Sequence, residues 1–376
     1  MQNYLVSTVL PALREKSDIH LLRELRLRWR NHTIMNKWLR RFFTYLDRYY
    51  VKHHSLPTLH EAGLTHFRVQ IYEQIKADVC AAILALINEH REGSVIDQDL
   101  IKNIVELFEA MGMGTLDAYC SDLEAPLLEA TAEYYKRQCA DWIAVDTTPE
   151  YLIKSERALE AERARVMDYL NSESEGKLLN TVEKELLESV EIDLLEKENS
   201  GCRFLLSNDR SEDLKRMFSL FSRLDKGLDP MSAIVQRFIT SKGEEIHNAR
   251  ENRLKSSTSS SKESNVDPEF ISALLKLHEK YLGVVRNEFS GHALFQKALK
   301  DAFVDIINKN TGQFTNAELM STYCDRILKS GGGERLSEAE VEGKLDKIVQ
   351  LFSYLTEKDL FAEIYRNQLS KRLLTG

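Results

Sequence analysis

Hydrophobic residues recur at intervals of three or four positions along most of the chain. Residues 66–80 show this pattern clearly, because their apolar positions are Phe67, Ile71, Ile75 and Val79. Such spacing places the side chains on one face of a helix. No segment alternates polar and apolar residues over the length that a strand needs, so the sequence predicts an all-α fold.

Residue types that begin and end helices flank several of these segments. One predicted helix has Asp97 as its N-cap and ends at Gly112. A second has Thr148 as its expected N-cap, with Pro149 at the first helical position. These positions predict where two of the longer helices begin.

Two segments lack any helical pattern. The serine-rich stretch at 251–267 is almost devoid of apolar residues, and we predict a flexible loop there because it buries too little surface to offset the entropy of ordering. The shorter stretch "SGGGER" at 330–335 lacks the lysine and hydroxyl residue of a phosphate-binding loop, and it is predicted to be an unstructured turn.

Two sequence patterns recur along the chain. An apolar pair followed by Leu-Phe places the dipeptide at positions 107/108, 220/221 and 351/352, and a second helical pattern begins at residues 66, 177 and 292. The spacing predicts a repeating unit of roughly 110–130 residues that contains about five helices. Because one unit alone leaves an apolar face uncovered, stacked units should form an elongated, solenoid-like stalk.

The register of these copies divides the chain into four predicted segments. They are the remainder of a first repeat without its opening helices (1–55), a second repeat (56–172), a third repeat that contains the serine-rich loop (173–290) and the final helices of the stalk (291–376). The register leaves open whether a natural truncation explains the missing helices. The C-terminal end is also expected to be a cut within a longer protein.

Composition narrows the possible functions. The 376 residues carry a net charge of −8, which argues against a surface that binds polyanions in general. No apolar run is long enough to span a membrane, and no cleavable signal is recognisable at the N-terminus. We therefore expect the protein in the cytoplasm and nucleus, with no membrane partner. The five cysteines never form a C-x-x-C motif, so reduced and mostly buried thiols are predicted.

Candidate catalytic and metal-binding residues are few. His53, His54 and His60 could form a metal cluster, but no cysteine or acid stands at ligand spacing between them, and Pro57 interrupts any helical arrangement. Solvated loop histidines are the preferred interpretation. No serine or cysteine stands beside a histidine in a recognised nucleophile motif. The sequence thus predicts a protein that is not an enzyme and has no metal or cofactor.

The first 50 residues are locally basic, with Trp29 and Trp38 among the arginines. Basic residues interleaved with aromatics are typical of nucleic-acid binding. Arginine and aromatic residues are also enriched where proteins contact proteins. Because the whole chain is acidic, we predict a protein partner and no nucleic acid, and keep nucleic-acid binding as the alternative.

Residues 42–51, "FFTYLDRYYV", contain five aromatic residues. On a continuous helix they form two adjacent stripes, one with Trp38, Phe42, Tyr45 and Tyr49, and one with Leu39, Phe43, Leu46 and Tyr50. Arg41 and Arg48 flank only the first stripe. A helix with two apolar stripes contacts two neighbours. The second stripe is predicted to pack inside its own bundle, and the first to face a partner protein.

Five segments resemble the amino-terminal half of the cullin family, the scaffolds of multisubunit ubiquitin ligases. They are "WLRRFFTYLDRYYV" (38–51), "INEHREGSVID" (87–97), "LLEKENSGCRFLLSND" (194–209), "MFSLFSRLDKGLDP" (217–230) and "EKDLFAEIYRNQLSKRLL" (357–374). The resemblance covers essentially the whole chain. It is greatest to the SCF-type (cullin-1) branch in its plant-like forms.

The resemblance implies a stalk of five-helix cullin repeats. In the family, the second and fifth helices of the first repeat bind an adaptor of BTB/POZ-like fold, which carries an F-box substrate receptor. The fifth helix matches residues 31–51, and the second has no counterpart in this sequence. The family's contacts carry over to Tyr45 and Arg48; the helical wheel adds Trp38, Arg41 and Phe42 as candidate partner-binding residues.

The resemblance also implies what the chain does not do alone. The RING-box subunit and the lysine that receives a ubiquitin-like modifier belong to the carboxyl half of the family, whereas a cullin-associated exchange factor is a further expected partner. The implied role is a non-catalytic scaffold. The alternative is a helical-rod subunit of a vesicle-tethering complex, which would show similar repetition of α-bundles.

Overall fold

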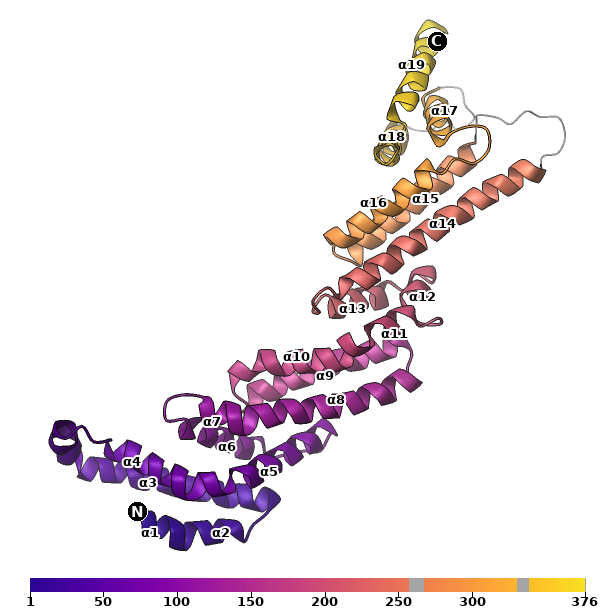
Figure 1. Cartoon of the computed structure of the whole chain (residues 1–376). Coiled ribbons are helices and arrows are strands. Elements are labelled where there is room, and N and C mark those ends of the chain that lie inside the picture. Colours follow the sequence, from indigo (N-terminus) through magenta and orange to yellow (C-terminus); the bar gives the residue numbers. More distant parts are fainter. Residues whose placement is uncertain (257–266, 330–337, 376) are drawn as a thin grey trace. The chain divides into compact units, whose positions relative to one another are not determined.

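The computed structural model describes residues 1–256, 267–329 and 338–375, and Figure 1 shows the chain as a series of helices. Within these ranges no strand forms, apart from one isolated bridge between Met113 and Thr115. The predicted all-α fold is confirmed. None of the described helices is both long enough and apolar enough to cross a membrane.

The chain forms two compact units, one of residues 1–145 and 154–189 and the other of residues 146–153 and 190–376. The helices of the first unit are α1 (Gln2–Tyr4), α2 (Leu10–Arg14), α3 (Asp18–Phe42), α4 (Leu59–Phe67), α5 (Glu73–Arg91), α6 (Gln98–Met111), α7 (Asp117–Tyr119), α8 (Ala125–Val145), most of α9 (Thr148–Tyr169) and α10 (Glu175–Leu186). Short turns of π-helix connect some of them, namely η1 (Leu5–Val9), η2 (Leu46–Val51), η3 (Arg68–Tyr72) and η4 (Cys120–Glu124).

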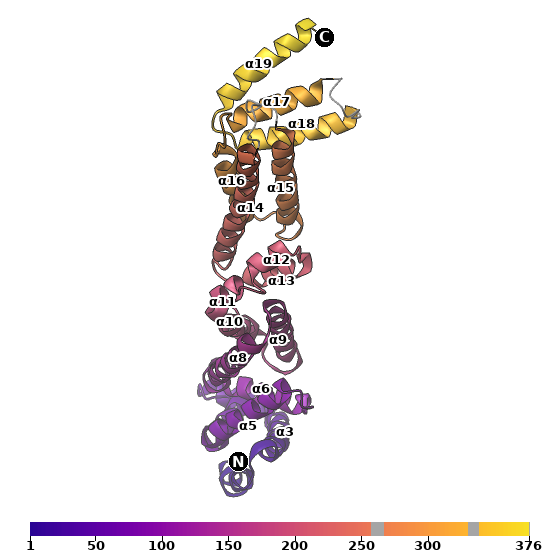
Figure 2. The same ribbon diagram turned by 90° about the vertical axis from the view of Figure 1, so that its right-hand side faces the viewer.

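The helices of the second unit are α11 (Glu191–Glu196), α12 (Cys202–Ser207), α13 (Ser211–Phe221), α14 (Leu228–Ser256), α15 (Pro268–Asn287), α16 (Ala293–Asn308), α17 (Asn316–Leu328), α18 (Glu338–Ser353) and α19 (Lys358–Thr375). Within this unit α14, α15 and α16 pack against one another, and they lie side by side in both views (Figure 1 and Figure 2). Single turns of 3₁₀-helix, η5 (Ser172–Ser174) and η6 (Glu188–Val190), flank α10.

The sequence repetition corresponds to a repeated helix order. The Leu-Phe dipeptides lie in α6, α13 and α18, and all their side chains are buried except that of Phe352, which is half-buried. A longer helix comes after each of them: α14 follows α13, α19 follows α18, and α8 follows α6 after the short α7 and η4. Equivalent packing also recurs, because α8 packs against α10 as α14 packs against α16. The four predicted segment boundaries stay predictions.

The predicted helix ends are confirmed at one helix and shifted at another. The Asp97 carboxylate accepts a hydrogen bond from the Leu100 backbone N–H at 3.0 Å, and Gly112 ends α6. At α9 the cap is Thr147, whose backbone N–H donates to the Glu150 carboxylate at 3.0 Å. Thr148 is instead buried and donates its hydroxyl to the Leu194 carbonyl at 3.2 Å. The sequence cannot distinguish two adjacent threonines as N-caps of α9. The structure does, because Thr148 is buried and bonds to Leu194 while Thr147 bonds to Glu150.

The predicted serine-rich loop is shorter than expected. Helix α14 continues to Ser256, where the Lys255–Glu251 ion pair of 2.6 Å spans one helical turn, so the predicted start at residue 251 was wrong. Asp267 caps α15 by accepting a hydrogen bond from the Phe270 N–H at 3.1 Å. Residues 257–266 and the predicted turn at 330–335 lie outside the described residues. All five cysteines are free thiols, and every one except Cys120 is buried, which confirms that prediction.

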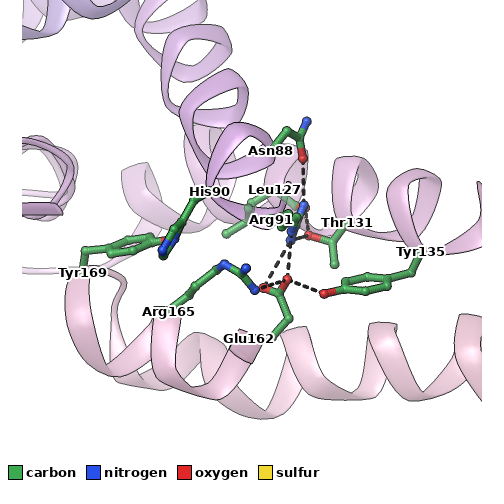
Figure 3. Close-up of polar contacts among 9 residues, drawn as sticks. All are labelled: Asn88, His90, Arg91, Leu127, Thr131, Tyr135, Glu162, Arg165 and Tyr169. Carbon is green, nitrogen blue, oxygen red and sulfur yellow. Dashed lines mark hydrogen bonds and ion pairs between the residues drawn. The ribbon is translucent and has the colours of Figure 1, made fainter. Parts of the chain in front are cut away.

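A buried polar cluster joins α5, α8 and α9 within the first unit (Figure 3). The Glu162 carboxylate lies 2.8 Å from Arg91 Nε and 2.9 Å from Arg165 Nη1. It also accepts a hydrogen bond of 2.7 Å from the Tyr135 hydroxyl, while Arg91 donates to Thr131 Oγ1 at 2.7 Å. Burial alone would lower the pKa of the Arg91 guanidinium, but the charge and hydrogen bonds of Glu162 raise it. The cluster therefore keeps its charges, and each charge has a partner.

Candidate partner-binding surface

Helix α3 carries all the predicted partner-binding residues except Tyr45 and Arg48, and its inner face is fastened to α4. His32 Nε2 donates a hydrogen bond to the Gly63 carbonyl at 3.0 Å, and Asn36 Nδ2 donates to the His60 carbonyl at 3.1 Å. A Cβ atom on Gly63 would lie 2.4 Å from the Asn36 amide nitrogen, so only glycine permits this close approach. Burial lowers the pKa of His32, although the hydrogen bond to the Gly63 carbonyl opposes this shift, so burial favours a neutral ring that donates through Nε2–H.

The predicted continuous helix over residues 31–51 is wrong, because α3 ends at Phe42. Phe43 leaves the helical region with φ −103° and ψ 27°, and the chain then forms the π-helical turn η2. The Thr44 hydroxyl donates to the carbonyls of Arg40 and Arg41, at 2.9 and 2.8 Å. These bonds satisfy carbonyl groups that a continuing helix would use, so the threonine side chain helps α3 to end there. Figure 1 shows the resulting short helical turn, in dark indigo, beyond the end of α3.

All five predicted partner-binding residues are exposed, but the structure brings only some of them together. Trp38 and Phe42 have ring centroids 6.2 Å apart, and the Arg41 guanidinium carbon lies 5.4 Å from the Trp38 ring centroid. Tyr45 instead pairs with Tyr49, at 4.9 Å between centroids. Phe42 and Tyr45 expose 78% and 77% of their surface. Among the described residues, no ring contact joins the Trp38 group to the Tyr45 group.

The predicted core stripe is also on the surface. Phe43, Leu46 and Tyr50 are exposed and Leu39 is half-buried, so their assignment to the bundle core was wrong. The helical geometry breaks at Phe43, after α3 ends, and a wheel that assumes one straight helix cannot place the residues beyond this break. We call the exposed set the aromatic tip, which comprises Trp38, Arg41, Phe42, Phe43, Tyr45, Leu46, Arg48, Tyr49 and Tyr50. The five aromatic residues within residues 42–51 were the feature of the sequence that could have indicated an exposed aromatic surface.

Asp47 holds the aromatic tip against the start of α4. Its carboxylate accepts a hydrogen bond from the Leu59 backbone N–H at 2.9 Å. Thr58 and Glu61 form a capping box at the same helix end, with hydrogen bonds of 3.2 and 2.8 Å. A negative charge at a helix N-terminus is favourable, because the helix dipole is positive there. Arg48 lies beside this junction and lines a shallow pocket of about 350 Å³.

The candidate metal histidines do not converge. The rings of His53 and His54 have centroids 5.1 Å apart, and the backbone carbonyl of His60 accepts the hydrogen bond from Asn36. Over the ranges that the structure describes, no group of three or more histidines, cysteines or acids is placed to hold a metal ion. The chemistry of this region is thus that of aromatic rings and guanidinium groups.

Comparison with known proteins identifies relatives of the whole chain. The model of the cullin alpha solenoid domain matches residues 1–376. Cullin-1 of Oryza sativa subsp. japonica is 45% identical over 375 residues, which cover 99% of this chain and 50% of the relative. Cullin-2 of Arabidopsis thaliana is 42% identical over 374 residues (99% and 50%), and Cullin-3 of Dictyostelium discoideum is 35% identical over 373 residues (99% and 47%). The chain spans about half the length of these relatives.

Proposed function

Because the chain belongs to the cullin family, we propose that it is a scaffold subunit of a cullin-RING ubiquitin ligase of the SCF type. The proposed direct partner is an F-box adaptor of BTB/POZ-like fold, which would carry an F-box substrate receptor. Family membership confirms the resemblance that the sequence motifs indicated. It also favours this role over that of a vesicle-tethering subunit.

The observation that carries the proposal is the aromatic tip. Large aromatic residues with adjacent arginines are the residue types that dominate binding energy at protein interfaces. Here Phe42 and Tyr45 are more than three-quarters exposed, whereas the capping box and Asp47 hold the backbone beneath them. A surface that is already ordered loses less entropy on binding than a flexible one. The tip therefore suits a protein partner that covers its rings.

The proposed mechanism is positional and non-catalytic. A scaffold that holds a substrate receptor and an activated ubiquitin on one assembly raises the effective concentration of substrate lysines near the thioester. The RING-box subunit is proposed to bind outside residues 1–376, and a cullin-associated exchange factor is a further proposed partner. Cytoplasm and nucleus are the proposed locations.

A binding measurement with purified F-box adaptor tests the proposal. The double variant Tyr45→Ala, Arg48→Glu should weaken adaptor binding roughly thirtyfold, because loss of an interface anchor removes about 2 kcal/mol. Isothermal titration calorimetry gives the affinity. Circular dichroism and the thermal midpoint should be unchanged, since both side chains are exposed.

The matched control is the double variant Phe204→Ala, Arg203→Glu, which alters an exposed aromatic and an exposed arginine on α12. We expect its adaptor affinity to stay within about twofold of the parent, as for surface sites outside an interface. An adaptor that does not bind the parent chain, or that binds both variants equally well, contradicts the proposal.

A further inference from the structure

A second surface lies along α3, closer to the N-terminus than the aromatic tip. A hollow of about 840 Å³ is lined by Arg23, Arg26, Leu27, Arg30 and Ile34 of α3 and by Asn103 of α6. We call it the α3 groove. None of its residues is part of the aromatic tip, so the inference drawn from it is independent of adaptor binding.

The α3 groove concentrates positive charge that has no partner among the residues that the structure describes. Across the described residues, the guanidinium groups of Arg23, Arg26 and Arg30 make no ion pair or side-chain hydrogen bond. Arg28 does not line the α3 groove, and its Nε lies 2.8 Å from the Glu24 carboxylate. Helix α3 contains seven arginines and lysines against two acids, although the chain as a whole carries −8. Such a local reversal of charge attracts an anionic partner.

Apolar surface accompanies this charge. Leu27 and Ile34 line the α3 groove and expose 50% and 46% of their surface. They stand three or four positions from Arg30, so all three side chains lie on one face of the helix. A ligand that fits must therefore offer both acidic groups and an apolar side chain.

The α3 groove is less suited to a nucleic acid than to a peptide. The three arginines span only about 10 Å of helix, which is enough for few phosphate contacts. The Trp29 ring also lines the groove, but it packs against Phe67 at 4.9 Å between centroids and is half-buried, which makes it a poorer stacking platform than an exposed ring.

From these contacts we propose that the α3 groove binds a short acidic peptide segment of a partner protein, with an apolar side chain seated between Leu27 and Ile34. The acidic groups of the segment pair with Arg23, Arg26 and Arg30. Charge complementarity supplies its orientation and its rate of association, and burial of the apolar side chain supplies part of its affinity.

Fluorescence anisotropy with three labelled probes tests this proposal on the full chain. The probes are a peptide in which leucines are interspersed among glutamates, a peptide of glutamate alone and oligothymidylate, all of the same length. We expect the mixed peptide to bind most tightly. The variant Arg26→Glu, Arg30→Glu should weaken that binding about tenfold, because two exposed ion pairs are replaced by repulsions of similar size.

Two further variants separate charge, apolar contact and general electrostatics. Lys136→Glu, Arg137→Glu makes the same change of charge on the exposed face of α8 and should alter binding by less than about twofold. Leu27→Ala, Ile34→Ala should weaken the mixed peptide about fivefold and leave the glutamate peptide unchanged. Circular dichroism verifies that each variant is folded.

Three results would overturn the proposal. One is the absence of mixed-peptide binding to the parent chain. Another is equal weakening by the α3 groove variant and the α8 control, which would reduce the effect to net charge. The third is that oligothymidylate binds the parent chain more tightly than the mixed peptide does and loses this binding in the variant Arg26→Glu, Arg30→Glu. Tyr45→Ala, Arg48→Glu should leave peptide binding intact, so failure here is distinguishable from failure of adaptor binding.

Discussion

The C-terminal ends of α3 and α9 have similar sequences, but one is exposed to solvent and the other is buried. Both helices are followed or ended by a Tyr-Leu pair before a polar connection, at residues 45–46 and 169–170. Tyr45 exposes 77% of its surface, whereas Tyr169 exposes 1%. The two ends thus differ in which neighbouring helix covers them, and their local sequence pattern does not reveal this.

The contacts of Tyr169 explain its burial. Its hydroxyl forms a hydrogen bond of 3.1 Å with His90 Nδ1 on α5, and the adjoining Arg91 enters the cluster around Glu162 (Figure 3). At the end of α3, Asp47 is the side chain that ties the aromatic tip to α4. The comparison indicates that an aromatic helix end becomes core when a polar cluster fastens a neighbour over it.

The largest difference should appear when the two tyrosines are truncated. Tyr169→Ala leaves a cavity in the core and should lower the free energy of unfolding by about 4 kcal/mol. Tyr45→Ala removes an exposed ring and should change it by less than about 0.5 kcal/mol. Urea unfolding followed by circular dichroism measures both. Equal losses in the two variants would show that the aromatic tip is covered in solution.

A somewhat smaller effect is expected from neutralising the buried acid. Glu162→Gln keeps the side-chain shape but leaves Arg91 and Arg165 buried without a counter-charge, which should cost about 3 kcal/mol. Urea unfolding is again the measurement. The control is Glu175→Gln, because the Arg163–Glu175 pair of 3.0 Å is exposed and should contribute less than about 1 kcal/mol. Similar values for both variants would refute the special role of the buried cluster.

The smallest effect should come from the junction beneath the aromatic tip. Asp47→Ala removes the acceptor of the Leu59 N–H and should make exchange of that amide about fivefold faster, corresponding to about 1 kcal/mol. Hydrogen exchange measured by nuclear magnetic resonance resolves this position. Asp47→Asn keeps an acceptor oxygen and should retain most of the protection. An unchanged exchange rate in Asp47→Ala would mean that other contacts order the tip.

Much of the fold could be predicted from the sequence because it depends on local spacing. The apolar period identified helices, Asp97 and Gly112 marked the ends of α6, and the repeated Leu-Phe pairs marked equivalent buried helices. These features depend on residues within one or two turns of each other. The exposed aromatic residues Trp38, Phe42 and Tyr45 were also predicted correctly as surface, since arginines flank them.

The remaining features needed the tertiary structure. Phe43, Leu46 and Tyr50 were assigned to the core because the helical wheel assumed a straight helix, and Thr44 interrupts that helix by bonding to carbonyl groups of its last turn. The cluster of Arg91, Glu162 and Arg165 was invisible for a different reason. Arg91 on α5 is about 70 positions from Glu162 and Arg165 on α9, and each of the three alone resembles an ordinary surface charge.

The sequence by itself determined that this protein is a repeated, all-α member of the cullin family, because helical period, caps and motifs are written in short segments. Only the tertiary structure decided which faces of those helices are covered. Burial depends on the neighbour that packs against a face, and the hydrophobic gain is the same for any apolar neighbour that excludes water. For that reason Tyr169 is core and Tyr45 remains available to a partner.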